Sequence, residues 1–107
     1  MGVMDRFKLD GKRAMITGGS RGLGKEMALA LAEAGADLLI VGREEASLKS
    51  AAAEIGRHGH RVDTLVGDVA IPDEATRVAE QAIREFGPIH ILINNVGGRR
   101  INIPTEE

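Results

Sequence analysis

Short apolar runs alternate along this chain with longer segments in which apolar residues recur every three or four positions. Four runs have the length of buried strands: residues 13–17, 37–42, 61–68 and 89–94. Three intervening segments have the spacing of amphipathic helices: residues 23–34, 48–55 and 72–86. Because a single helix separates each strand from the next, we expect parallel strands joined by right-handed crossovers, with helices on both faces of the sheet.

Each predicted helix has one stripe of residues that we expect to be buried. These residues are Leu23, Met27, Ala30, Leu31 and Ala34 in the first helix, Leu48, Ala51, Ala52 and Ile55 in the second, and Ala75, Val78, Ala79, Ala82, Ile83 and Phe86 in the third. Gly35 is expected to end the first helix, since glycine is favoured just past a helix C-terminus. Pro72 suits the first turn of the third helix, and Asp73 and Glu74 complement its positive end.

Glycines are grouped where the first strand passes into the first helix. Gly18, Gly22 and Gly24 form the pattern Thr-Gly-x-x-x-Gly-x-Gly, which differs from the commonest dinucleotide fingerprint, Gly-x-Gly-x-x-Gly. In an open parallel sheet this turn lies at the carboxyl end of a strand, and the helix N-terminus beside it offers unpaired N–H groups and partial positive charge. We therefore predict that the turn seats the pyrophosphate of a dinucleotide. The alternative is a tight turn without a ligand.

Three motifs in order make the chain resemble the classical branch of the short-chain dehydrogenase/reductase family. LDGKRAMITGGSRGLG (9–24) resembles the opening of that family through its cofactor loop, and GDV (67–69) resembles its Asp after the third strand. NNVG (94–97) resembles its Asn-Asn-Ala-Gly, with Val96 in place of Ala. The resemblance implies an α/β fold, a Rossmann-like three-layer sandwich with a partial doubly wound parallel sheet of about four strands in the order 3-2-1-4. Residues 1–107 are expected to form a single dinucleotide-binding domain.

The same resemblance implies which residues contact a nicotinamide cofactor. Asp68 would contact the adenine ring, Asn95 and Gly97 would lie on the adenosine side, and Asn94 would tie the sheet together. The complete predicted set is Gly18, Ser20, Arg21, Gly22, Leu23, Gly24, Arg43, Asp68, Val69, Asn95, Val96 and Gly97. For Asp68 the alternative is a residue that only caps a turn.

The end of the second strand predicts which nicotinamide cofactor is bound. NAD-binding proteins usually place an acidic residue there, whereas this chain has Gly42 followed by Arg43. Arg21 in the glycine loop and Arg43 would bracket a 2′-phosphate with charge-assisted hydrogen bonds. We therefore expect NADP rather than NAD, although Glu44 keeps NAD open and the two arginines would otherwise be surface charges.

Composition narrows the class of protein further. Lys and Arg total 14 and Asp and Glu total 16, a net charge of -2, whereas nucleic-acid and membrane-surface binding require a strongly basic patch. The chain has no cysteine, and His58 and His60 have too few neighbouring ligands, so no metal site is predicted. No apolar run approaches the ~20 residues of a spanning helix. We expect a cytoplasmic protein that binds neither nucleic acid nor membranes.

The catalytic residues of the resembled family have no counterparts in this sequence. The family's Ser, Tyr, Lys and helix Asn follow the fourth strand, whereas this chain stops at Glu107 and contains no Tyr. We expect the cofactor-binding half of an oxidoreductase for a small-molecule alcohol or carbonyl, inactive alone, and either a fragment or a truncated form. Its fourth strand would leave an open edge that favours homo-oligomers. The alternatives are a non-catalytic nucleotide-binding or self-assembling module and, against the evidence of Gly42 and Arg43, a methyltransferase.

Overall fold

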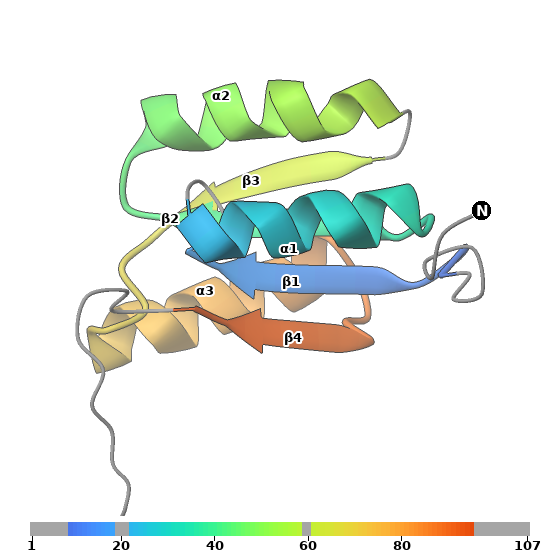
Figure 1. Ribbon diagram of the computed structural model, residues 1–107. Coiled ribbons are helices and arrows are strands. Elements are labelled where there is room, and N and C mark those ends of the chain that lie inside the picture. Colours follow the sequence, from blue (N-terminus) through green and yellow to red (C-terminus); the bar gives the residue numbers. More distant parts are fainter. Residues whose placement is uncertain (1–8, 19–21, 59–60, 96–107) are drawn as a thin grey trace, which may run out of the picture.

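A computed structural model describes residues 9–18, 22–58 and 61–95 of the chain, which form one sheet with helices on both faces (Figure 1). The elements are β1 (Arg13–Thr17), α1 (Gly22–Glu33), β2 (Asp37–Gly42), α2 (Glu45–Ile55), the short 3-10 helix η2 (Gly56–His58), β3 (Val62–Val66), α3 (Pro72–Glu85) and β4 (Ile91–Asn94). All strand pairs are parallel, in the order β3-β2-β1-β4. This architecture confirms the predicted Rossmann-like α/β fold and its strand order.

The bounds of β1 and β2 coincide with the prediction, whereas β3 and β4 are shorter than predicted. β3 ends at Val66 because the chain turns at the next residues toward α3, with the Ile71 N–H donating to the Asp68 carbonyl at 3.0 Å. β4 begins only at Ile91, which lies opposite Ala14 of β1. The residues before it complete the turn out of α3, since Gly87 has a φ of 102°.

Two layers of apolar side chains cover the two faces of the sheet. Neighbouring residues of one strand point to opposite faces, so Ile16 packs beneath α1 and α2 while Met15 packs against α3. The α1–α2 layer consists of Ala14, Ile16, Ala28, Ala32, Ala36, Leu38, Ile40, Leu48, Ala51 and Ile55. The α3 layer consists of Met15, Leu39, Val41, Val78, Ala82 and Phe86. The first two helices and the third therefore lie on opposite faces, so helices cover both faces of the sheet, as predicted.

The predicted buried stripe of α1 is wrong. The helix buries Gly24, Ala28 and Ala32, while Leu23 is 67% exposed. Small residues face the sheet because α1 approaches it closely, and the larger Leu29 and Leu31 pack only partly at its sides. Of the predicted stripe, Ala34, just past the helix, is buried, and Met27, Ala30 and Leu31 are half-buried.

The stripes of α2 and α3 were predicted more closely, with Leu48, Ala51, Ile55, Val78, Ala82 and Phe86 all buried. Two predicted members on α3 are wrong, because Ala79 is exposed and Ile83 is 63% exposed. α3 contacts the sheet along a narrow i, i+4, i+8 stripe, so its flank faces outward.

Within the described ranges, no helix is long and apolar enough to cross a membrane.

Candidate functional site

The turn that follows β1 is joined by hydrogen bonds to the strands on both sides, at the edge of the sheet where all four strands end (Figure 1). The Gly18 N–H donates to the Val41 carbonyl of β2 at 2.9 Å. On the other side, the Asn95 N–H donates to both the carbonyl and the Oγ1 of Thr17, each at 3.1 Å. These bonds fix the start of the glycine turn at the carboxyl edge, as the sequence analysis predicted.

Asn94 and Thr17 close this edge on the β4 side. Thr17 is buried, with 4% of its surface exposed. Its hydroxyl donates a hydrogen bond to Asn94 Oδ1 at 2.7 Å. Asn94 therefore links the ends of β1 and β4, the structural role that the resemblance implied for it. Val96 and Gly97, which follow, lie outside the described residues.

Gly18, Gly22 and Gly24, the glycines of the motif, face different surroundings. Gly18 has a φ of 74°, and a Cβ built on it would overlap the carbonyl oxygen of Asn95. A Cβ on Gly24 would overlap the carbonyl oxygen of Gly18 and lie 2.7 Å from Asn95 Nδ2. Gly22, with a φ of 61°, has open space where its Cβ would be. Gly18 and Gly24 therefore allow protein segments to touch one another, whereas Gly22 borders free space.

The helix that begins at this open position carries no acidic residue in its first turn. By contrast, α2 has Glu45 and α3 has Asp73 and Glu74 in their first turns. Carboxylates at a helix N-terminus offset the partial positive charge of its free N–H groups, and α1 lacks them. The open space at Gly22 and this uncompensated positive end together fit a phosphate group. Ser20 and Arg21, two other predicted site residues, lie outside the described residues.

Asp68 lies just beyond the end of β3, at the same carboxyl edge. Its Oδ1 accepts a hydrogen bond from the Ala70 N–H at 3.1 Å, and its own N–H donates to Glu74 Oε1 at 2.8 Å. Asp68 thus does form a turn cap, as the alternative interpretation held. Within the described residues only one of its two carboxylate oxygens takes a hydrogen bond, so the other can accept from a ligand. Val69 is half-buried against the α3 layer.

Two charged residues, Arg43 and Glu44, follow the end of β2. Arg43 is exposed directly after the strand. Glu44 is the N-cap residue of α2, and its Oε1 accepts a hydrogen bond from the Ser47 hydroxyl at 2.9 Å. A side chain at Gly42 would approach Leu48 Cδ2 to 3.2 Å, so this position is tight against α2. Glu44 is therefore engaged with its own helix.

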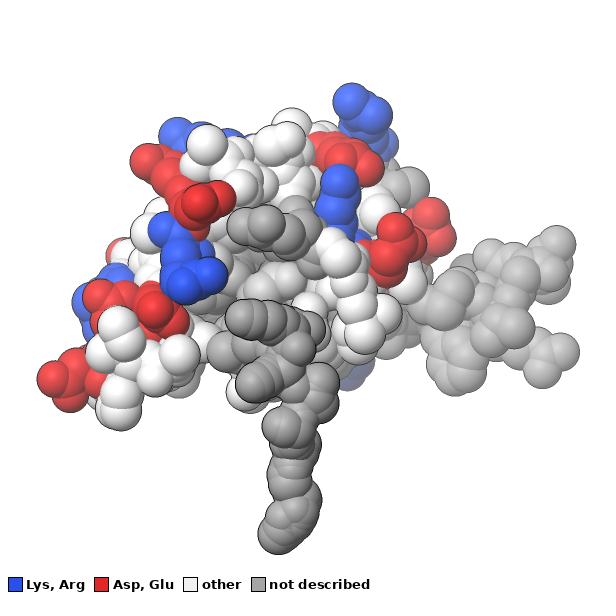
Figure 2. All heavy atoms as spheres, turned by 60° about the vertical axis from the view of Figure 1, so that its left-hand side comes forward, with Lys and Arg blue, Asp and Glu red and all other residues white. Residues whose placement is uncertain are grey.

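Charges of both signs are mixed over the face that contains this edge, as Figure 2 shows for the described side chains. A broad surface of one sign is typical of polyanion binding, whereas backbone donors can hold a small anion without one.

The part of the chain that the structure describes contains no group of three His, Cys, Asp or Glu residues placed to hold a metal ion.

One ion pair links the two helices above the sheet. Lys25 Nζ of α1 lies 2.5 Å from Glu54 Oε1 of α2. The hydrogen bond from Lys25, with a further electrostatic contribution from the same ammonium group, lowers the pKa of Glu54 below its ordinary value. The side chain of Lys25, which lies near the start of α1, therefore points toward α2.

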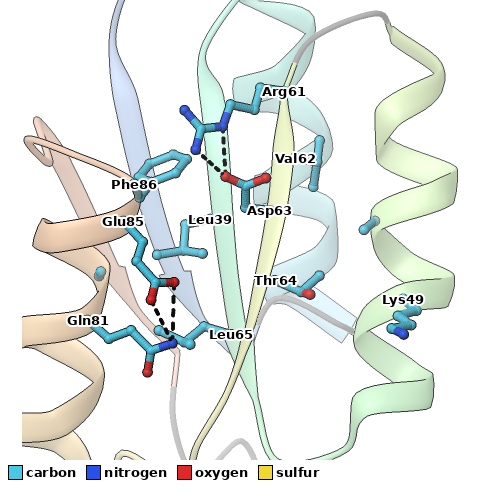
Figure 3. A pocket seen from close by; sticks show the side chains of 12 residues that line it. Leu39, Lys49, Arg61, Val62, Asp63, Thr64, Leu65, Gln81, Glu85 and Phe86 are labelled. Carbon is cyan, nitrogen blue, oxygen red and sulfur yellow. Dashed lines mark hydrogen bonds and ion pairs between the residues drawn. The ribbon is translucent and has the colours of Figure 1, made fainter.

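A separate groove of about 480 Å³ lies beside β3, between α2 and α3 (Figure 3). Arg61 binds Asp63 Oδ2 through Nε at 2.7 Å, and its guanidinium lies 4.9 Å from the centre of the Phe86 ring. On α3, which ends next to Phe86, Gln81 donates to Glu85 Oε1 at 3.3 Å. These polar side chains are therefore paired with neighbouring side chains. The groove runs alongside β3 and does not lie at the carboxyl end of the strand. We therefore place the candidate site at the glycine turn and not in this groove.

Comparison with known proteins identifies relatives of this chain. The sequence profile of the short chain dehydrogenase family matches residues 12–107. An uncharacterized oxidoreductase of Mycobacterium tuberculosis is 46% identical over 100 residues, covering 94% of this chain and 38% of that protein. The L-rhamnose 1-dehydrogenase (NADP(+)) of Thermoplasma acidophilum is 44% identical over 91 residues, covering 81% of this chain and 35% of that protein.

Among solved structures, the L-sorbose reductase of Gluconobacter frateurii, complexed with NADPH and L-sorbose, superposes with a TM-score of 0.80. It is 37% identical, over 85% of this chain and 35% of that one. The chain thus spans little more than a third of the length of these relatives.

Proposed function

Because the chain belongs to the short-chain dehydrogenase family, we propose that it is the cofactor-binding part of an NADP-dependent oxidoreductase. The observation that carries the proposal is the glycine turn, which is closed against the protein at Gly18 and Gly24 and open at Gly22. It meets a helix N-terminus without a neutralising carboxylate. Such a site suits the pyrophosphate of a dinucleotide.

NADP would supply or accept a hydride at its nicotinamide ring, and the residues of this chain would hold the other end of the molecule. In this proposal the N–H groups of Gly22 and Leu23 donate to phosphate oxygens, and Gly24 keeps the helix close to the turn. The free oxygen of Asp68 accepts from the adenine amine, while Val69 and Asn95 border the adenosine. Ser20, Arg21, Val96 and Gly97 complete the proposed set by resemblance alone.

The preference for NADP rests on the end of β2. Gly42 provides no carboxylate for the ribose hydroxyls, and Glu44 is engaged with Ser47 at the start of α2. Arg43 is exposed there and free of the core, as a partner for a 2′-phosphate requires. The NADP(+) specificity in the name of the L-rhamnose 1-dehydrogenase and the NADPH in the sorbose reductase complex support the same choice.

For the complete protein we propose hydride transfer to or from a small hydroxylated alcohol or carbonyl compound, since the named relatives act on rhamnose and sorbose. The 107-residue chain contains no tyrosine, and we assign it no catalytic residue. It would bind cofactor as a single domain without turnover.

Homo-oligomers are also proposed, because Leu92 on β4 is 63% exposed and β1 is the only neighbour of β4 in the described sheet.

Calorimetric titration of the 107-residue chain with NADPH and with NADH tests this function. We expect NADPH to bind more tightly, and Arg43→Gln to weaken NADPH by about tenfold while leaving NADH unchanged. Lys49→Gln removes another exposed cation, on α2, and serves as the matched control. Equal affinities for the two cofactors would refute the NADP preference, and binding of neither would refute the function.

A further inference from the structure

We propose that Glu74 and Arg77 act as a positioning pair that orients Asp68 to select an adenine base by its exocyclic amine. The inference rests on the proposed cofactor function, because Asp68 belongs to that site. Neither Glu74 nor Arg77 is assigned to the site by sequence. The structure assigns them through the turn that joins β3 to α3.

The pair holds this turn from both ends. Glu74 Oε1 accepts the Asp68 N–H at 2.8 Å, on the far side of the turn. Arg77 Nη2 donates to the carbonyl of Val66, the last residue of β3, at 3.0 Å and lies 3.5 Å from the same Glu74 oxygen. The guanidinium and the carboxylate therefore bridge the strand end and the Asp68 backbone.

The residue between these two anchors has little freedom. A Cβ on Gly67 would lie 2.5 Å from Val78 Cγ2 and 3.0 Å from Arg77 Nη2, so the turn lies directly on α3. The Gly67 N–H also donates to the Gly42 carbonyl at 2.8 Å, which ties the turn to β2. The position of Asp68 relative to β2 is consequently set by its surroundings.

Glu74 departs from the usual use of a carboxylate at this helix position. An acid three residues into a helix commonly reaches back to the N–H of the N-cap residue, which here is Ile71. Glu74 instead binds the N–H of Asp68, three residues before the N-cap. Asp73, beside it in the same first turn, has the same charge and no such bond among the described residues.

The consequence for ligand choice follows from the chemistry of the carboxylate. Asp68 Oδ1 accepts from the Ala70 N–H, which leaves the other oxygen for a donor. An ionised carboxylate only accepts hydrogen bonds. The exocyclic amine of adenine donates, whereas hypoxanthine presents a carbonyl oxygen at that place and would be repelled. A fixed Asp68 therefore discriminates between the two bases, and a loosened one does not.

The test compares NADPH with reduced nicotinamide hypoxanthine dinucleotide phosphate by calorimetry on the 107-residue chain. We expect the native chain to favour NADPH by about tenfold, and Glu74→Ala to bring this ratio close to one by weakening NADPH alone. Asp73→Ala, which removes the neighbouring acid, should keep the ratio. Glu74→Gln, of the same size and still able to accept from the Asp68 N–H, should show an intermediate ratio and provides a readout if Glu74→Ala does not fold.

The outcomes separate this inference from the function beneath it. If the native chain binds both dinucleotides equally, or if both Glu74 variants keep the native ratio, the positioning role is wrong while cofactor binding stands. If Asp73→Ala lowers the ratio as much as Glu74→Ala, the effect belongs to helix charge and the proposal fails. If the native chain binds neither dinucleotide, both the inference and the proposed function fall.

Discussion

The backbone of α1 at Gly24 lies so close to the carbonyl oxygen of Gly18 that no side chain fits between them. This contact anchors the helix to the turn after β1, and the Asn95 side chain lies at the same point. The glycines of the motif therefore have two different tasks. Those at 18 and 24 let protein segments meet, and the one at 22 borders the space where a ligand would lie.

The first prediction concerns this contact. Gly24→Ala places a methyl group against the Gly18 carbonyl and Asn95 Nδ2, and we expect it to lower the free energy of unfolding by about 1–3 kcal/mol. Gly56→Ala is the control, because a Cβ there meets nothing within 4 Å and φ is -65°. Urea unfolding measures both. Equal stabilities of the two variants would show that α1 is not held at this point.

A second prediction separates helix charge from ligand binding. Leu23 is 67% exposed in the first turn of α1, so Leu23→Asp should not disturb the core. A carboxylate there should stabilise the helix by about 0.3–1 kcal/mol and, by repelling phosphate, weaken NADPH by about tenfold. Leu23→Asn is the control for both effects, because asparagine has the shape of aspartate without its charge.

Thermal unfolding and calorimetric titration give the two readouts, which should change in opposite directions for Leu23→Asp relative to Leu23→Asn. If NADPH binds the two variants equally well, the phosphate does not lie at the start of α1.

The third prediction is a pH dependence of the α1–α2 ion pair. The hydrogen bond from Lys25 lowers the pKa of folded Glu54 relative to the unfolded chain. The resulting stability is therefore present above the ordinary glutamate pKa of about 4.3 and is lost as the pH falls through the folded pKa. Lys25→Met should be less stable than the native chain at pH 7, and the difference should shrink below about pH 4.

Denaturant unfolding between pH 7 and 3 measures this difference. Lys49→Met removes an exposed pair with Glu45, 3.3 Å away on the same helix, and should have a smaller effect at neutral pH. A Lys25→Met deficit that stays constant across the whole range would mean that packing of the lysine stem, and not its charge, provides the stability.

The fourth prediction concerns association through the open strand. Leu92 is 63% exposed on β4, which pairs only with β1 in the described sheet, and we expect the 107-residue chain to form oligomers. Leu92→Lys should shift it to monomer, as measured by light scattering after gel filtration. Leu23→Lys changes a similarly exposed leucine at the start of α1 and should leave the oligomer intact. Monomeric native chain would contradict the prediction.

Much of the fold could be predicted because β1 and β2 are buried on both faces and appear as uninterrupted apolar runs. The buried stripe of α1 could not be predicted in this way. A pattern of large apolar residues favours Leu23 and Met27. The close approach of α1 to the sheet instead requires small residues, and Gly24, Ala28 and Ala32 are the buried ones. Hydrophobic size and contact distance compete in such helices, and the sequence shows only the first.

The candidate site was predictable to a similar extent. The spacing of the glycines located the turn, but the sequence does not show that Gly18 and Gly24 are needed for protein contacts. Glu74 was interpreted only as a complement to the helix dipole. Its bond to Asp68 depends on how residues 67–71 turn onto α3, and no spacing rule predicts that turn.

An NMR titration of the isotope-labelled chain with NADPH, following each backbone amide, tests the central claim most directly. The account predicts the largest shift changes at Gly22, Leu23 and Asp68, at the carboxyl edge of the sheet. Shift changes centred on Thr64 and Gln81, in the groove beside β3, would contradict it, as would an unchanged Gly22 amide at saturating NADPH.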